Sequence, residues 1–214
     1  MNLNEHYFNG QVEYVKERRI PGQSWGSLNT RILLDTNCFK FNDEIKIIQN
    51  PTIWLNIKVD YDSKSLKKQH QYVYDMCQAK SYVFINGAKI VDFKVEPKDE
   101  NNKPIPGAPM KIRYSAEIGA SGVSCSSQRY RQFNRSLVTG YIDEVGENGS
   151  LKIKSAYMVK KEIRNREIFV ISPTSTTLGP SLLKKKVFVS GSIFGKTPDR
   201  SDLTYVAADF IEII

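Results

Sequence analysis

The residues best placed to bind a ligand lie in a stretch of alternating apolar and polar residues, 52–61. Successive side chains of a β-strand point to opposite faces, so one face of this stretch is expected to fill a core. That face comprises Ile53, Leu55, Ile57 and Val59. Trp54 and Lys58 then lie on the outer face, where a nucleic-acid base stacked on the indole gains about 1–3 kcal/mol and the lysine meets a phosphate. The alternative is that Trp54 packs under a linker or against a neighbouring domain.

Two further residues extend this surface. In the stretch 27–35 the residues expected to face inward are Leu28, Ile32 and Leu34. Arg31 then faces outward, beside Trp54 if the two strands pair. Trp25 lies in the polar, glycine-containing turn just before this stretch and is either a flap or a stacking residue. Stacking is favoured because three basic residues, Lys16, Arg18 and Arg19, approach from the preceding strand.

The second half of the chain carries its own basic residues. Lys152 and Lys154 alternate with apolar residues and are expected to form an outward basic ridge together with basic residues of the next hairpin that include Arg166. Tyr157 and Phe169 are expected close to this ridge. Such a ridge binds phosphates without sequence preference and with strong salt dependence. Outward charges on strands are also ordinary solubility devices. The neighbouring segment 119–135 begins rich in Gly and Ser and ends with interleaved cations and aromatics that include Arg129, Tyr130 and Arg131.

Known catalytic motifs are missing from the sequence. It contains no GxxxxGK[ST], GxSxG or HExxH pattern, and its carboxylates form no repeated pair suited to two-metal chemistry. The three cysteines are widely spaced and lack a CxxC motif, which indicates reduced thiols rather than disulfides or a zinc site. His6 and His70 are both expected at the surface. We therefore expect no enzyme, no metal and no cofactor.

Two sequence patterns occur twice, in the same order. The segment Phe8–Val15 resembles Val138–Val145, with a glycine in each, and Val83-Phe84-Ile85-Asn86-Gly87 resembles Val187-Phe188-Val189-Ser190-Gly191. This arrangement predicts one all-β module used in tandem. Chance similarity between short apolar segments is the alternative.

The strand pattern fits this duplication. Strands are predicted near 8–19, 27–36, 52–61, 82–95 and 110–118, and again near 136–146, 150–161, 166–172, 187–195 and 203–213. A helix is predicted over 67–79 because Val73, Met76 and Cys77 form one apolar stripe. In the second copy, the Gly-Pro-containing segment 178–186 predicts one turn or an irregular crossover at that position rather than a long helix. Three strands, a helix and two strands is the order of an oligonucleotide-binding (OB) barrel.

The predicted fold is therefore all-β, with two tandem five-stranded OB-like barrels, the first with a short helix between its strands 3 and 4. The expected domains are residues 1–118 and 136–214, joined by the linker 119–135. Four prolines in 97–109 predict an exposed loop between the last two strands of the first barrel.

Composition places limits on the partners. With 214 residues and 40% hydrophobic residues, the chain is long enough and apolar enough to form folded cores. The formal net charge of +8 favours a polyanionic partner without proving one. The N-terminus lacks the features of a signal peptide, and no apolar run approaches membrane-spanning length, so no membrane association is expected.

With these patterns in place, the chain resembles the OB-fold single-stranded-DNA-binding proteins of phage and bacterial replication. The likeness rests on the stretch 185–193 and on the β-branched and aromatic final strand 204–214. It implies a non-catalytic protein of replication or recombination in the cytoplasm of a bacterial or phage-infected cell.

The predicted function is binding of single-stranded nucleic acid, with DNA favoured and RNA as the alternative. Bases would stack on Trp54, Trp25, Tyr130 and Tyr157, and phosphates would contact Lys58, Arg31, Lys152, Lys154, Arg129 and Arg131. A structural or assembly subunit that uses its barrels for protein docking is the second reading. A nuclease ranks last because no carboxylate cluster supports it.

Overall fold

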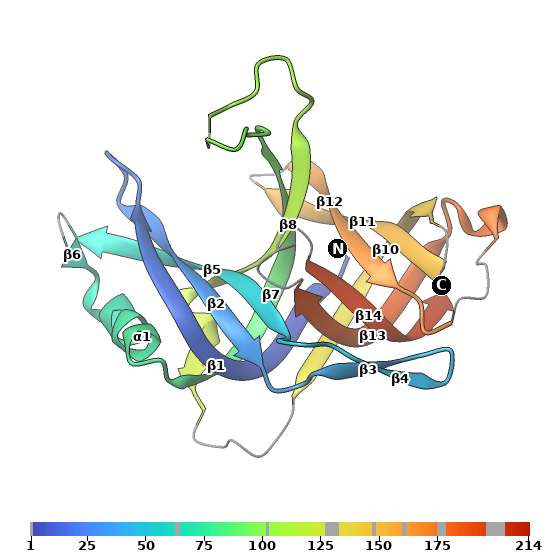
Figure 1. Cartoon of the computed structure of the whole chain (residues 1–214), viewed down its shortest axis with the longest axis horizontal. Helices are drawn as coiled ribbons and strands as arrows, with labels where there is room; N and C mark the ends of the chain where they lie inside the picture. The colour runs from blue at the N-terminus through green and yellow to red at the C-terminus, as the bar shows by residue number, and fades with distance from the viewer. Residues whose placement is uncertain are drawn as a thin grey trace.

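The computed structural model of the protein describes residues 2–62, 65–101, 103–126, 133–146, 149–159, 162–174, 179–195 and 204–214. Strands dominate and the main sheet bends into two rings that lie side by side (Figure 1). None of the helices in this described part is long and apolar enough to cross a membrane. The all-β class predicted from the sequence is confirmed.

The first ring, called the first barrel, is closed by backbone pairing. Its strands are β1 (Asn4–Arg19), β2 (Trp25–Leu34), β5 (Thr52–Asp62), β7 (Tyr82–Val95) and β8 (Lys111–Gly119). β1 pairs with β2, β2 with β5, β5 in parallel with β8, β8 with β7, and β7 returns to β1. The short strand β6 (Ser65–Leu66) pairs with the end of β5.

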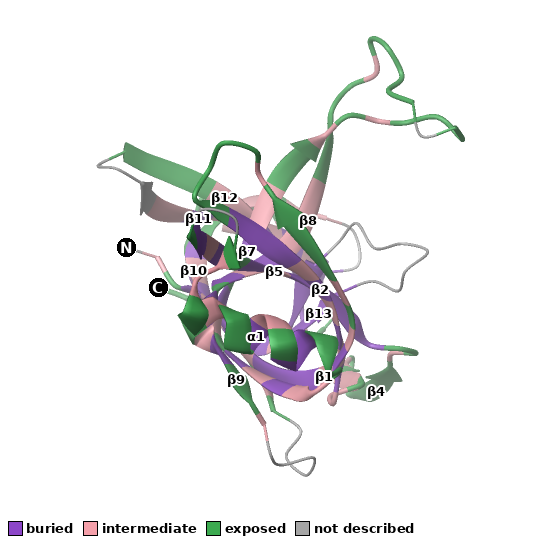
Figure 2. Ribbon diagram, turned by 90° about the vertical axis from the view of Figure 1, so that its left-hand side faces the viewer, coloured by how far each residue is buried: buried purple, intermediate pink, exposed green. Residues whose placement is uncertain are grey.

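One helix covers an end of this barrel (Figure 2). α1 (Lys68–Gln78) lies in the chain between the third and fourth barrel strands, as predicted, and buries Val73, Met76 and Cys77. The spacing of these residues places them on one face of the helix. Beside the helix, β9 (Val123–Cys125) pairs with β7 and follows the 3₁₀ turn η1 (Ala120–Gly122).

The second ring, called the second barrel, repeats this order of pairing. Its strands are β10 (Asn134–Val145), β11 (Ser150–Val159), β12 (Glu162–Ile171), β13 (Lys186–Gly195) and β14 (Thr204–Ile213). β10 pairs with β11, β11 with β12, β12 in parallel with β14, β14 with β13, and β13 returns to β10. Where the first barrel has α1, the described residues contain only the 3₁₀ turn η3 (Pro180–Leu182).

The two sequence repeats occupy equivalent positions. Gly10 of β1 pairs with Val83, and Gly140 of β10 pairs with Val187. The register of each first strand shifts two residues after its glycine, between Val12 and Tyr14 and between Ile142 and Glu144. A Cβ added at either glycine would collide with a carbonyl oxygen of the next strand, so only glycine fits these two close approaches.

The barrels share a continuous hydrophobic core and a strand junction. Residues 4–8 of β1 pair with residues 134–138 of β10. His6 lies in this junction and is fully buried, with its ring nitrogens 2.8 Å from Ser136 Oγ and Asn4 Oδ1. The expectation that His6 is a surface residue is therefore wrong, because pairing between segments more than a hundred residues apart buries it.

A hairpin between β2 and β5 was not predicted. β3 (Cys38–Phe41) and β4 (Glu44–Ile47) pair with each other and extend beneath the second barrel (Figure 1). Phe39 lies 5.7 Å from Phe194, ring centre to ring centre, and the Asn42 N–H donates to the Pro173 carbonyl at 2.8 Å. The hairpin therefore ties the first barrel to the second.

The expected division into domains at residues 118 and 136 stays a prediction. β9 lies inside the expected linker but belongs to the sheet of the first barrel through its pairing with β7. The proline-containing connection between β7 and β8 is largely exposed over its described residues and projects from the barrel as an arm (Figure 1).

Candidate nucleic-acid interface

The outer face of β5 carries Trp54. The alternating residues Ile53, Leu55, Ile57 and Val59 are 0–1% exposed, so the opposite side chains point away from the core. Trp54 is partly exposed and lies opposite Arg31 of β2 in the strand pairing. The Tyr14 ring packs against the indole in a T-shaped arrangement, at 5.9 Å between ring centres and an interplanar angle of 77°. The indole is thus held in a fixed orientation without being sealed in the barrel interior.

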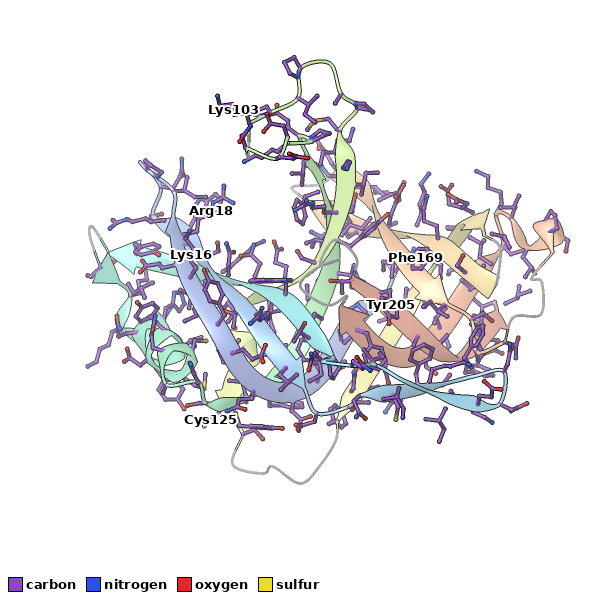
Figure 3. The ribbon with its side chains drawn as sticks, in the orientation of Figure 1. Lys16, Arg18, Lys103, Cys125, Phe169 and Tyr205 are labelled. Atoms are coloured by element: carbon purple, nitrogen blue, oxygen red, sulfur yellow. The ribbon has the colours of Figure 1, made fainter. Side chains whose placement is uncertain are left out.

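A groove of about 670 Å³ runs past this indole. The outer face of β2 and β5 contributes Asn29, Trp54 and Asn56, and the base of the β7–β8 arm contributes Phe93 and Arg113. Arg18 of the β1–β2 hairpin also lines it. Figure 3 shows Lys16 and Arg18 on this hairpin and Lys103 on the β7–β8 arm. These are the surfaces and loops by which OB barrels bind oligonucleotides.

The second barrel completes the groove. Tyr157 of β11 and Arg166 of β12 line it from the other side, with the Arg166 guanidinium carbon 4.0 Å from the centre of the Tyr157 ring. The same two residues line an adjoining cavity of about 550 Å³, together with Lys58 and Lys89. Glu117 lines both spaces. One continuous concave surface therefore contains Trp54, Lys58 and Tyr157.

Tyr157 and the two lysines Lys152 and Lys154 lie on opposite faces of β11, so the expectation that they share one surface is wrong. Along β11, Tyr157 shares its face with Ile153 and Ser155, and Ser155 donates through its hydroxyl to the Leu3 carbonyl at 3.2 Å. Lys152 and Lys154 point to the opposite face. Because β11 extends past the end of its own barrel, Tyr157 faces the first barrel instead.

Most of the predicted phosphate-binding cations already have carboxylate partners. Arg31 lies 3.0 Å from Glu13, Lys58 lies 2.6 Å from Glu117, Lys152 pairs with Glu144, and Lys154 lies 2.9 Å from Asp143. The hydrogen bond from Lys154 lowers the pKa of Asp143, and the hydrogen bond to Glu144 raises the pKa of Lys152. A phosphate bound by these residues would have to displace the carboxylates, and the sequence pattern did not reveal these ion pairs.

Trp25 lies outside the residues that line the groove. It is the first residue of β2, 46% exposed, and pairs with Asp60 at the far end of the same outer face. Arg129, Tyr130 and Arg131 lie outside the described residues, so their place relative to the groove stays a prediction.

The second barrel has an equivalent outer face. Both barrels have a register shift between their first two strands, and the first residue of the second strand paired after this shift is Arg31 in one barrel and Lys152 in the other. Lys152 therefore corresponds to Arg31. The residue opposite Lys152 on the next strand is Phe169, which corresponds to Trp54. Phe169 is partly exposed and lies beside Tyr205 of β14 (Figure 3). Phe169 was expected close to the basic ridge but was not among the residues predicted to bind nucleic acid. Alignment of the repeats through Gly10 and Gly140 gives it the position of Trp54.

Few groups in the described residues offer other chemistry. None of their His, Cys, Asp and Glu side chains forms a cluster of three or more that could hold a metal ion. Burial raises the pKa of Cys77 to about 11, so its thiol is protonated at neutral pH.

Comparison with known proteins reveals a shared fold. No protein-family model matches the chain, and no curated protein matches its sequence. The crystal structure of a deletion mutant of the single-stranded DNA binding protein from Thermus aquaticus is similar, with a TM-score of 0.61 and 12% sequence identity. The match covers 100% of this chain and 95% of that chain. The similarity therefore extends over both barrels.

Proposed function

We propose that the protein binds single-stranded DNA in the groove between the barrels and does not act on it chemically. The observation that carries this proposal is the meeting of Trp54 from the first barrel and Tyr157 from the second on one concave, cation-containing surface. Two aromatic side chains, one from each barrel, suit a flexible DNA strand whose bases can turn outward and stack on them. The fold shared with the Thermus protein supports the same conclusion.

Phosphates would exchange with the carboxylates now paired to the cations. In the groove, Arg18, Arg113 and Arg166 would contact the DNA backbone, and Lys58 would do so after leaving Glu117. Each phosphate neutralised releases counterions, so affinity falls as salt rises. A pre-paired cation contributes less to affinity than its charge alone indicates, because its ion pair is lost on binding.

The bound DNA would continue onto the second barrel. There, Lys152 and Lys154 with Phe169 offer a second, weaker surface of the same kind. Because the two surfaces are linked, DNA held by one surface has a raised effective concentration at the other. Trp25 at the far end of the first face, and Arg129, Tyr130 and Arg131 in the linker, are further proposed contacts. The biological setting we propose is replication or recombination in the cytoplasm of a bacterial or phage-infected cell.

A binding titration tests this function. The probe is fluorescein-labelled oligothymidine of about 30 nucleotides, roughly twice the largest site of one OB barrel. The same experiment with a duplex and with an RNA oligomer at two salt concentrations separates the partners. We expect saturable binding to oligothymidine, weaker binding to the duplex, and a loss of affinity at the higher salt. Absence of binding at the lower salt would overturn the proposal.

An assembly subunit is the second candidate function. It is favoured by Ile45 and Ile47 of β4, which are 72% and 73% exposed on a hairpin with an unpaired edge among the described strands. Exposed apolar side chains on an edge strand are typical of protein-docking surfaces. A salt-resistant oligomer in light scattering, combined with no retention on single-stranded-DNA resin, would favour this reading.

A further inference from the structure

One wall of the groove carries a row of polar side chains beside Trp54. β2, β5 and β8 are neighbours in the sheet, and their pairing places Asn29, Asn56 and Glu117 in one row across them. All three residues line the groove. Asn56 follows Trp54 by two residues on the same face of β5, which separates their Cα atoms by roughly 7 Å. A base stacked on the indole would therefore have this row beside its edge.

Glu117 supplies a carboxylate to this row. Its side chain is 20% exposed, and its Oε1 lies 2.6 Å from Lys58 Nζ. Lys89 of β7 is its neighbour on the other side in the strand pairing. A carboxylate accepts hydrogen bonds through both of its oxygens, so the ion pair with Lys58 leaves further acceptor positions. Glu117 can therefore accept hydrogen bonds from a ligand in the groove.

The amide of Asn56 places a hydrogen-bond donor beside this acceptor. Its Oδ1 is buried and makes no hydrogen bond with the described residues. The side chain is nevertheless partly exposed and lines the groove, which leaves the NH₂ group as the polar part that faces a ligand. A donor from β5 and an acceptor from β8 therefore lie side by side, on strands roughly 4.8 Å apart.

Only the bases of a DNA strand can donate hydrogen bonds to Glu117. The phosphodiester groups and the deoxyribose rings inside a strand carry no N–H or O–H group. In a single strand the Watson–Crick edges of the bases are free for such contacts. Guanine offers two adjacent donors there, N1–H and N2–H, with the O6 acceptor beside them. Adenine and cytosine offer one amino group, and thymine offers one N3–H between two carbonyl oxygens that repel a carboxylate.

From these observations we propose that this wall of the groove recognises guanine, an inference that rests on the proposed binding of single-stranded DNA. Guanine N1–H and N2–H donate to the Glu117 carboxylate, and the Asn56 amide donates to O6. Lys58 turns from the carboxylate to a phosphate of the same strand. Hydrogen bonds to a carboxylate are stronger than those between neutral groups. Stacking on Trp54 and Tyr157 accepts every base, so other sequences still bind and guanine is preferred.

The test compares labelled oligomers that differ only in one kind of base. Every third thymine of the oligothymidine probe is replaced by guanine, by hypoxanthine (the base of inosine) or by adenine, in a lithium buffer that prevents guanine quadruplexes. Hypoxanthine keeps the two rings, O6 and N1–H of guanine and lacks only the N2 amino group, so it controls for purine stacking. We expect the guanine oligomer to bind the full chain roughly five-fold or more tightly than the hypoxanthine and adenine oligomers.

Matched variants assign the preference to one carboxylate. Glu117→Gln should abolish the difference between the guanine and hypoxanthine oligomers, because an amide has one acceptor oxygen and no charge. Asp92→Asn is the control and should keep the difference, since Asp92 also lines the groove but lies opposite Tyr114 instead of beside Asn56.

The outcomes separate this inference from the proposed function. Equal affinity of the natural chain for the guanine and hypoxanthine oligomers, with oligothymidine still bound, would overturn guanine recognition alone, and this comparison does not depend on the folding of any variant. A guanine preference that survives in Glu117→Gln would also overturn it. Failure to bind any of the oligomers would overturn the proposed function together with this inference.

Discussion

Arg31 and Trp54 are direct cross-strand neighbours on the outer face of the first barrel, with the guanidinium carbon 6.0 Å from the centre of the indole ring. This distance is at the limit of a cation–π contact, and Glu13 holds the guanidinium through an ion pair at 3.0 Å. The indole therefore has a defined orientation in the groove before any ligand arrives. A preoriented ring loses little conformational freedom on binding.

Trp54→Ala should weaken oligothymidine binding roughly 5- to 150-fold, because one stacked base is lost. Tyr72→Ala is the matched control, since Tyr72 is a 59% exposed aromatic on α1, outside the groove lining. Fluorescence anisotropy measures both affinities. Equal oligothymidine affinities for the two variants would show that Trp54 does not take part in binding.

Glu117→Gln should tighten oligothymidine binding roughly two- to five-fold, the size of an exposed ion pair. The substitution releases Lys58 and removes a negative charge shared by both parts of the groove. Glu44→Gln, which breaks the exposed pair with Lys46 on β4, is the control and should have no effect. Weaker binding by the Glu117 variant would mean that the pair positions the groove rather than competing with phosphate.

Gly10→Ala and Gly140→Ala should each lower the free energy of unfolding by roughly 1–3 kcal/mol, because the added methyl group is forced against a neighbouring strand. The contacts are the carbonyl oxygens of Leu33 and Lys154. Gly179→Ala meets only Ser181 Oγ at 3.6 Å and should change stability by less than about 0.5 kcal/mol. Denaturant unfolding compares the three variants. If the Gly10 and Gly140 variants lose no more unfolding free energy than the Gly179 variant, the close approach of these two glycines to the neighbouring strands is contradicted.

Burial at the barrel junction lowers the pKa of His6 to about 3. The unfolded chain has an ordinary histidine pKa of about 6.5, so below that pH the unfolded state binds a proton that the folded state does not. The stability contributed by neutral His6 is complete above about pH 6.5 and is lost toward pH 3, by up to about 1.4 kcal/mol per pH unit. Denaturant unfolding at several pH values should show a shallower acid loss for His6→Gln than for the natural chain. If the free energy of unfolding falls equally with pH for the variant and the natural chain, His6 is excluded as a cause of the loss of stability in acid.

Alternation along each strand was sufficient to predict most of the fold. The inward set of β5 and the apolar stripe of α1 both follow from a regular period, which depends only on local geometry. The β3–β4 hairpin was overlooked although its signal is present. Asn42 and Asp43, both with positive φ, form a two-residue turn between alternating residues.

Features that depend on distant contacts could not be predicted. The burial of His6 follows from pairing of β1 with β10, and the position of Tyr157 follows from the extension of β11 past its own barrel. The carboxylate partners of Arg31 and Lys58 depend on which strands become neighbours and on side-chain geometry. Residue spacing along the sequence contains none of this information.

Photo-crosslinking tests most directly whether DNA lies between the barrels. The full chain is irradiated with oligothymidine in which 5-iodouracil replaces some thymines, and the attached residues are identified by mass spectrometry. The account predicts crosslinks to Trp54 and Tyr157 on the two walls of the groove, reduced by excess unlabelled oligothymidine. Crosslinks confined to aromatics outside the groove, such as Tyr72 of α1, would contradict it.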